Sequence, residues 1–340
     1  MGRHIGFIFS TVAVITLNFQ GVKTWLFGAC GLLTFIFPTI ESMASTPPVE
    51  PPPLTEWVSP DLRDHNLAGL IWSEAEQAFI TPVNFIGKIR ESRAVLLGER
   101  HDNTDHHRLQ AWIVSQLAKA HGVSVGFEML DEPDKDALKS VKKFEDFADA
   151  VNWKTSGWPK FSVYQSLFQA VYKTKSPVLA VHPSRKRLMG VARSVANQPV
   201  ESWGKISVAG LTALAKDITD SHCGYANDQM VTMMTAAQRF KDHWMVKELR
   251  EQGGDRPLVL IAGNGHVRKD YGVPNHLDIE SATVGFVEVW KDKEHPRDYD
   301  ADRFDYTWFT PRVDSLDPCE KYKEQLEQMK KHYQHKKKLK

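Results

Sequence analysis

The sequence lacks most of the short motifs that identify a catalytic or cofactor site. It has no HExxH zinc motif, no CxxC pair and no CxxCH motif for covalent haem attachment. These absences leave HExxH-type zinc proteases and c-type haem proteins without support. An excess of one charge is also missing, because 43 Lys and Arg residues balance 42 Asp and Glu residues to a formal net charge of +1. Nothing in this balance predicts nucleic acid as a partner.

Cysteine is scarce, with only three residues in the chain. Cys30 lies in an apolar run near the start, which leaves Cys223 and Cys319 as an even pair. Such a pair can form a disulfide in an oxidising compartment, but the sequence does not say whether the two residues are close. A bond between them is therefore an open alternative.

Residues 1–44 are predicted to be an export signal rather than part of the fold. Lys23 precedes the apolar run WLFGACGLLTFIF, and Ser42 to Ala44 form a cleavage site of small residues. Because another apolar run comes before this complete signal, one hypothesis is that translation starts at Val22.

The cysteine in FGAC gives an alternative interpretation of the same segment. FGAC resembles a lipoprotein cleavage box, which would anchor the protein to a membrane through Cys30. Cleavage after Ala44, lipidation and an uncleaved anchor all place the domain outside the cytoplasm, and we expect a periplasmic protein.

The rest of the sequence predicts one domain between a linker and a tail. The Pro-rich linker STPPVEPPP begins at residue 45 and ends at 53, and the domain spans residues 54–320. Residues 321–340 end in KKHYQHKKKLK, which we interpret as a solvated helix end.

Apolar runs of strand length alternate with amphipathic stretches such as HHRLQAWIVSQLAKAHG and VYQSLFQAVYKT. This alternation predicts an α/β fold, with a mainly parallel β-sheet flanked by helices. The interval 185–250 has no strand signal, so we expect a helical insertion that covers the carboxyl end of the sheet. The predicted strands are 94–98, 124–129, 177–182, 257–263 and 283–290.

Ionisable side chains stand where three of these strands end. Glu99 and His101 follow the first strand, Glu128 closes the second, and His266 and Arg268 follow the fourth after a Gly-Asn-Gly turn. Because ligands bind beyond the carboxyl ends of strands in open α/β sheets, we expect these side chains to meet in one crevice. Two buried carboxylates repel, so at least one should have a raised pKa unless a cation lies between them.

The helix after the first strand carries more histidine. Thr104 or Asp105 is predicted to cap it, with His106 and His107 in its first turn. A helix N-terminus disfavours imidazolium, so these two histidines should stay neutral. We expect Asp102 to orient one of the imidazoles.

Three further stretches bear on a site. Gln238 and Asp242 share one stripe of the helix VTMMTAAQRFKDHWMVKEL and are expected to line the crevice. The aromatic residues of VNWKTSGWPKFSVYQSLF fit either core packing or a wall against a planar ligand. The loop HCGYAND groups His222, Cys223 and Tyr225, which are either plain loop residues or iron ligands.

Several motifs together resemble the ChaN-type haem-binding lipoproteins, also called the haem-binding uptake family. The motifs are LLGERHDN with HHRLQ, GFEML, YQSLF, AQRFKDHWM, AGNGHVRKDYGVP and FDYTWFTPRVDSLDPCE, in family order from about residue 94 to 320. The resemblance implies an exported protein that binds haem non-covalently, as a homodimer enclosing stacked haems and supplied by outer-membrane haem-uptake machinery. Where relatives tend to have Asn, this chain has His182, an additional candidate ligand.

Haem requires an apolar slot, an axial ligand and cations for its propionates. Arg268 or Arg185 would meet a propionate, since the guanidinium group suits carboxylates. The sequence does not choose among four axial-ligand candidates, which are Tyr164, His222, Tyr225 and Tyr271.

A hydrolase is the alternative function. The wider group that includes erythromycin esterase and the TraB/Tiki proteins shares the elements GE-x-H and G-x-x-H, which correspond here to residues 98–101 and 263–266. In such an enzyme Glu99 or Glu128 would act as general base. His101 and His266 would be its catalytic partners or the ligands of a divalent metal.

Overall fold

The computed structural model describes residues 47–53, 56–194, 203 and 206–338. The predicted export signal, with Val22 and Cys30, lies outside these residues. Among the helices described, none is long and apolar enough to cross a membrane.

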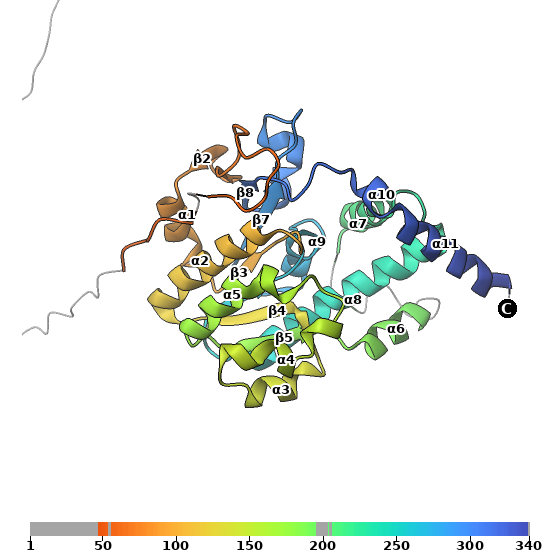
Figure 1. Cartoon of the computed structure of the whole chain (residues 1–340), viewed down its shortest axis with the longest axis horizontal. Coiled ribbons are helices and arrows are strands. Elements are labelled where there is room, and N and C mark those ends of the chain that lie inside the picture. Colours follow the sequence, from red (N-terminus) through yellow and green to blue (C-terminus); the bar gives the residue numbers. More distant parts are fainter. Residues whose placement is uncertain (1–46, 54–55, 195–202, 204–205, 339–340) are drawn as a thin grey trace, which may run out of the picture. The chain divides into compact units, whose positions relative to one another are not determined.

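In the described part of the chain, an eight-stranded sheet has the order β2-β1-β8-β7-β3-β6-β4-β5 (Figure 1). Every pairing from β8 to β5 is parallel, and β1 pairs antiparallel with both β2 and β8. The strands are β1 (Ile71–Ser73), β2 (Ala78–Ile80), β3 (Ala94–Leu97), β4 (Ser124–Asp131), β5 (Val178–His182), β6 (Leu258–Ile261), β7 (Ser281–Glu288) and β8 (Tyr306–Thr310).

The α/β fold predicted from the sequence is confirmed. The five predicted strands correspond to β3, β4, β5, β6 and β7, and the described residues of the predicted insertion at 185–250 are mostly helical. Three strands were not predicted. β1 and β2 have three residues each, which is too few for a periodic signal, whereas β8 was missed although it is as long as β5.

Helices cover both faces of the sheet (Figure 1). The helices are α1 (Pro82–Ile89), α2 (Thr104–His121), α3 (Asp134–Ser140), α4 (Phe147–Ala150), α5 (Phe161–Lys173), α6 (Arg185–Ser194), α7 (Val208–Ser221), α8 (Asp228–Gly253), α9 (Asn264–Val267), α10 (Pro318–Lys321) and α11 (Lys323–Lys338). Because α6, α7 and α8 form the insertion, they supply the walls of the site described below.

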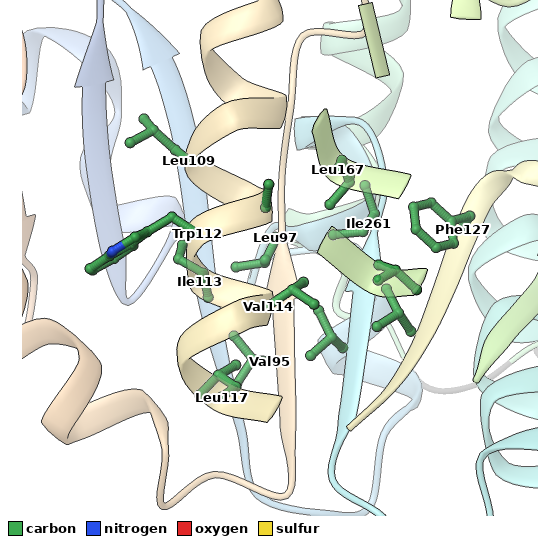
Figure 2. Close-up of a cluster of buried hydrophobic side chains, with 14 of the residues drawn as sticks. Val95, Leu97, Leu109, Trp112, Ile113, Val114, Leu117, Phe127, Leu167 and Ile261 are labelled. Atoms are coloured by element: carbon green, nitrogen blue, oxygen red, sulfur yellow. The ribbon is translucent and has the colours of Figure 1, made fainter. Parts of the chain in front are cut away.

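The strand residues alternate between two cores. Val95 and Leu97 of β3 pack with α2 and α5 in the larger core (Figure 2), whereas Ala94 and Leu96 belong to a second core with Met245 of α8. This alternation follows from the two-residue period of a strand. A sheet buried on both faces exposes its polar chemistry only at the strand ends.

Gly126 of β4 should not tolerate a side chain. A Cβ atom there would lie 2.6 Å from Leu249 Cδ2 and 2.9 Å from Val181 Cγ1. Because α8 packs against the sheet at this point, we expect Gly126→Ala to lower the free energy of unfolding by about 1–3 kcal/mol. Urea denaturation measures the change.

Gly87 of α1 is the matched control for this substitution. An added Cβ at Gly87 would meet no atom within 4 Å. Since alanine favours a helix over glycine by up to about 1 kcal/mol, Gly87→Ala should be neutral or stabilising. Equal losses in both variants would contradict the packing explanation.

Candidate functional site

The parallel order of β3, β6 and β4 brings the predicted site residues together. Glu99 and His101 follow β3, His266 lies in α9 after β6, and Glu128 is within β4. The Nε2 atom of His101 is 3.8 Å from Glu128 Oε2, and His266 Nε2 is 3.1 Å from Glu128 Oε1. The four side chains therefore form one cluster at the carboxyl end of the sheet, and their chemical roles stay predictions.

Glu99 is the centre of the first half of this cluster. Its Oε1 atom lies 2.8 Å from His101 Nδ1 and accepts a hydrogen bond of 2.9 Å from the Tyr164 hydroxyl. Its Oε2 atom lies 3.2 Å from His107 Nε2. Burial alone would raise the pKa of Glu99, but His107 and His101 outweigh it and hold the pKa well below 4.5.

Glu128 and His266 form the second half. Glu128 Oε2 accepts the Gly263 N–H at 2.8 Å, and His266 Nδ1 also contacts Asp242. Burial disfavours the charged form of both groups. His266 nevertheless keeps the pKa of Glu128 well below 4.5. Glu128 and Asp242 in turn raise the pKa of His266 above 6.5. The site thus favours a buried carboxylate–imidazolium pair.

The structure bears on two sequence expectations about this cluster. Gln238 and Asp242 do reach the crevice from α8, since Gln238 Nε2 is 3.0 Å from His266 Nδ1 and Asp242 contacts the same atom. A raised pKa at Glu99 or Glu128 was expected unless a cation lies between them, and this exception applies, because His101 contacts both carboxylates and its own pKa is raised by them against the effect of burial. The carboxyl group whose pKa is raised, by burial, is that of Asp242.

The pair of Glu128 and His266 should stabilise the fold most at pH values between about 4.5 and 6.5. The lowered pKa of Glu128 contributes stability that is present above 4.5 and is lost as pH falls through the folded value. The raised pKa of His266 contributes stability that is present below 6.5 and is lost as pH rises through the folded value. Urea denaturation at a series of pH values should therefore show that His266→Gln weakens the alkaline decline. His121→Gln, at an exposed histidine, should leave the decline unchanged, and an unaltered decline in His266→Gln would contradict the assignment.

The helix-capping prediction was wrong. Asn103 is the N-cap of α2, and its Oδ1 atom accepts the N–H groups of Asp105 and His106. His106 behaves as expected, because burial lowers its pKa well below 6.5 and keeps the imidazole neutral. Its Nδ1 atom accepts the Arg100 N–H at 2.9 Å.

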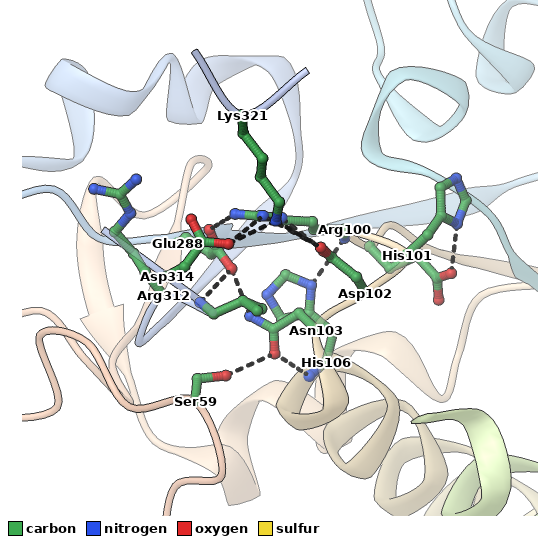
Figure 3. A network of polar contacts seen from close by, with 12 residues as sticks. Ser59, Arg100, His101, Asp102, Asn103, His106, Glu288, Arg312, Asp314 and Lys321 are labelled. Carbon is green, nitrogen blue, oxygen red and sulfur yellow. Dashed lines mark hydrogen bonds and ion pairs between the residues drawn. The ribbon is translucent and has the colours of Figure 1, made fainter. Parts of the chain in front are cut away.

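The prediction that Asp102 orients an imidazole was also wrong. Asp102 Oδ1 instead accepts from Arg100 Nε at 2.7 Å, within a network that includes Glu288, Asp314 and Lys321 (Figure 3). We define residues 311–322 as the C-terminal strap. The network joins this strap to the ends of β3 and β7.

Among the described residues, two large cavities open at this end of the sheet, and Asn264 and Val287 line both. The helix-side cavity has a volume of about 630 Å³ and lies against α7 and α8. The strap-side cavity has a volume of about 510 Å³ and includes Arg100, His101 and Tyr322 in its walls. Cavities of this size accommodate a small organic ligand.

The helix-side cavity contains some of the candidate haem-binding residues. His222, Tyr271 and Arg268 line it. Tyr164 is buried under Glu99, and the Tyr225 ring lies beneath the Lys330 amine, so neither lines this cavity. The remaining candidates lie elsewhere, with Arg185 exposed at the start of α6 and His182 at the end of β5, where burial lowers its pKa to about 4.

The aromatic side chains of residues 151–168, which extend into α5, mostly pack in the core rather than form a wall against a ligand. Trp153 and Phe168 are buried and contact each other edge-on at a centroid distance of 5.6 Å. Trp158 differs, because its ring contacts that of His101 at 4.7 Å. Trp158 and Tyr164, which donates to Glu99 at 2.9 Å, are thus the members of the stretch that contact the cluster.

The divalent-metal alternative finds no support in the geometry. Within the residues that the structure describes, no group of three His, Cys, Asp or Glu side chains is arranged to hold a metal ion. His101 and His266 are already paired with carboxylates. Serine chemistry is also unsupported: residues 122–126 spell GVSVG, but Ser124 is buried and donates to the Gly253 carbonyl oxygen at 2.9 Å.

Together, the sheet, the Glu/His cluster and the cavities define an α/β protein with a ligand-sized site at the carboxyl ends of its parallel strands. The chain belongs to the family described as haem-binding uptake, Tiki superfamily, ChaN, whose model matches residues 85–277. The family resemblance seen in the sequence is thereby confirmed.

Comparison with solved structures finds similar chains. The structure of ChaN of Campylobacter jejuni, described as showing cofacial haem binding, is 22% identical, covers 71% of this chain and 96% of that chain, and gives a TM-score of 0.61. A mutant erythromycin esterase, EreC in its open conformation, is 14% identical and covers 60% of this chain and 72% of that chain, with a TM-score of 0.35. No curated protein matches the chain.

Proposed function

We propose that this protein binds haem non-covalently in the helix-side cavity and handles haem iron outside the cytoplasm. The volume of about 630 Å³ suits a ligand of this size. Apolar side chains on several elements would contact the macrocycle. They include Leu188, Leu214, Ile218, Met234 and Phe304.

Cations for the propionates lie in the same walls. Arg268, Arg303 and Lys241 line the cavity. Arg268 is held by Asp217 and Asp270, which fix its guanidinium group and raise its pKa against the effect of burial. Arg303, about 31% exposed at its side chain, is the more accessible partner for a carboxylate.

The observation that carries the proposal is the hydrogen bond made by His222. Its Nδ1–H donates to the Ile218 carbonyl oxygen at 2.7 Å. This bond selects the tautomer in which Nε2 keeps its lone pair, the form that an iron ligand requires. His222 therefore fits the axial position best among the four candidates.

The tyrosines fit less well. Burial raises the pKa of the Tyr271 hydroxyl, which also donates to Asp217 at 2.8 Å. Burial and Glu99 raise the pKa of Tyr164. Both effects disfavour the tyrosinate form that would bind iron.

The acid–base hydrolase is not favoured. Neighbouring imidazoles lower the pKa of Glu99 and of Glu128, and a carboxylate with a lowered pKa is a weak general base. Export through residues 1–44, an anchor at Cys30, a homodimer and outer-membrane uptake machinery stay predictions from the sequence and the family.

A haemin titration tests the proposal. Purified protein should give a saturable Soret band at a defined molar ratio, at a wavelength characteristic of histidine ligation. A titration with the featureless spectrum that an unrelated protein gives would overturn the proposed function.

A further inference from the structure

The C-terminal strap, residues 311–322, crosses from β8 to the helical insertion. Its first half is fixed to the sheet, because the Val313 N–H donates to Glu288 Oε1 at 3.0 Å. Lys321 Nζ near its end lies 2.6 Å from Asp314 and 3.5 Å from Asp102 (Figure 3). The strap is thus anchored at the strand ends by hydrogen bonds and ion pairs.

A disulfide continues this attachment to the other side of the site. Cys319 in the strap is bonded to Cys223, in the turn after α7, across 96 positions of sequence. The neighbours of Cys223 on the chain, Ser221 and His222, line the helix-side cavity. On the other side, Pro318 and Tyr322 of the strap line the strap-side cavity. The one bond therefore joins walls of both cavities.

The wall that the disulfide holds has little packing of its own. Of the residues of α7, only Gly210 and Leu214 are buried. Apart from its packing against α8, its attachment to the domain is polar and includes the contacts of Asp217 with Arg268 and Tyr271. A segment with few buried apolar contacts opens at low free-energy cost once a covalent restraint is removed.

The linkage is within reach of a reductant. Both cysteines are partly exposed, and their neighbours Gly224, Pro318 and Glu320 are exposed. Cys223 has φ of 53°, a left-handed conformation that favours glycine or asparagine after a helix. Cys223 therefore adopts a backbone conformation that cysteine disfavours.

We propose that the Cys223–Cys319 disulfide is a redox-controlled latch that retains the ligand in the helix-side cavity. The inference rests on the proposed function, because the residue it holds in place is His222. A dithiol reductant supplies two electrons and two protons, the S–S bond breaks to give two thiols, and the reductant becomes a disulfide. The turn that carries His222 and the α7 wall are then free to move, and the ligand leaves.

Dissociation of zinc protoporphyrin IX tests the latch, because its metal centre does not change oxidation state under the reductant. The full chain with Cys30→Ser leaves only the two latch cysteines, and transfer to excess apomyoglobin gives the rate. We expect dithiothreitol to accelerate dissociation by about tenfold or more. Cys223→Ser/Cys319→Ser should release the porphyrin at that faster rate without reductant and show no further response to it. Equal rates with and without the disulfide would overturn the latch.

A second measurement separates failure of the latch from failure of the proposed function. Hydrogen–deuterium exchange of the ligand-free protein should become faster in residues 208–222 on reduction, with β3 and β6 unchanged. Porphyrin that fails to bind the oxidised protein overturns haem binding, whereas unchanged exchange in this segment overturns the latch on its own.

Discussion

Glu128→Ala is expected to lower the free energy of unfolding by about 3–5 kcal/mol. The carboxylate is 3% exposed and has His266, His101 and Lys241 around it. Without it, the positive charge of His266 and Lys241 would remain in a buried site with only Asp242 to offset it. Chemical denaturation near pH 5.5, where His266 is protonated in the folded state, measures the full effect.

Two control variants separate charge from position. Glu128→Gln keeps the size of the side chain and one acceptor for the Gly263 N–H, so it should lose less stability than Glu128→Ala. Glu132→Ala removes another glutamate just after β4, but its partner Arg187 is about half exposed, so little change is expected. Equal destabilisation by Glu128→Ala and Glu132→Ala would show that the buried pair stabilises the fold no more than an exposed ion pair does.

The position of the cluster was predictable because it depends only on strand direction. Apolar runs identified β3, β4 and β6, and parallel strands end at the same edge of a sheet. Glu99, Glu128 and His266 therefore had to come close, whatever their detailed geometry. The same reasoning placed Gln238 and Asp242, since a helical stripe aimed at that edge meets it with several residues.

Partners set by long-range packing were not predictable. Arg100 is separated from Glu288 by 188 positions, and no local pattern links the two residues. This distant partner helps to draw Arg100 and Asp102 into the strap network and away from the imidazoles. The disulfide is similar, because the closeness of Cys223 and Cys319 depends on where α7 and the strap end.

Local competition explains the incorrect helix cap. Asn103, Thr104 and Asp105 are consecutive residues that all favour an N-cap position. The structure selects Asn103, because the Asp105 carboxylate accepts the N–H groups of Val58 and Ser59 instead. The position of that distant segment therefore removes Asp105 as a cap.

The candidate iron ligands also differ in their surroundings, and these favour His222. His222→Ala should weaken haemin binding by at least about a hundredfold, because loss of a partner of a metal ligand already costs 10–100-fold. The Soret band should move to the position of weakly bound haemin, while the far-ultraviolet circular dichroism stays unchanged. Added imidazole should restore the original spectrum in His222→Ala, since it replaces the missing ligand in a cavity that is otherwise intact.

Two matched variants decide whether the effect belongs to His222. His121→Ala removes an exposed histidine at the end of α2, outside the helix-side cavity, and should leave the spectrum and the affinity unchanged. Tyr271→Phe removes a hydroxyl that donates to Asp217 and should alter affinity only slightly, without moving the Soret band. If Tyr271→Phe moves the band and His222→Ala does not, the axial ligand is Tyr271, and the tautomer fixed by Ile218 serves only to hold the turn. If neither variant changes the spectrum, neither His222 nor Tyr271 is the axial ligand, and the proposed assignment of His222 is overturned.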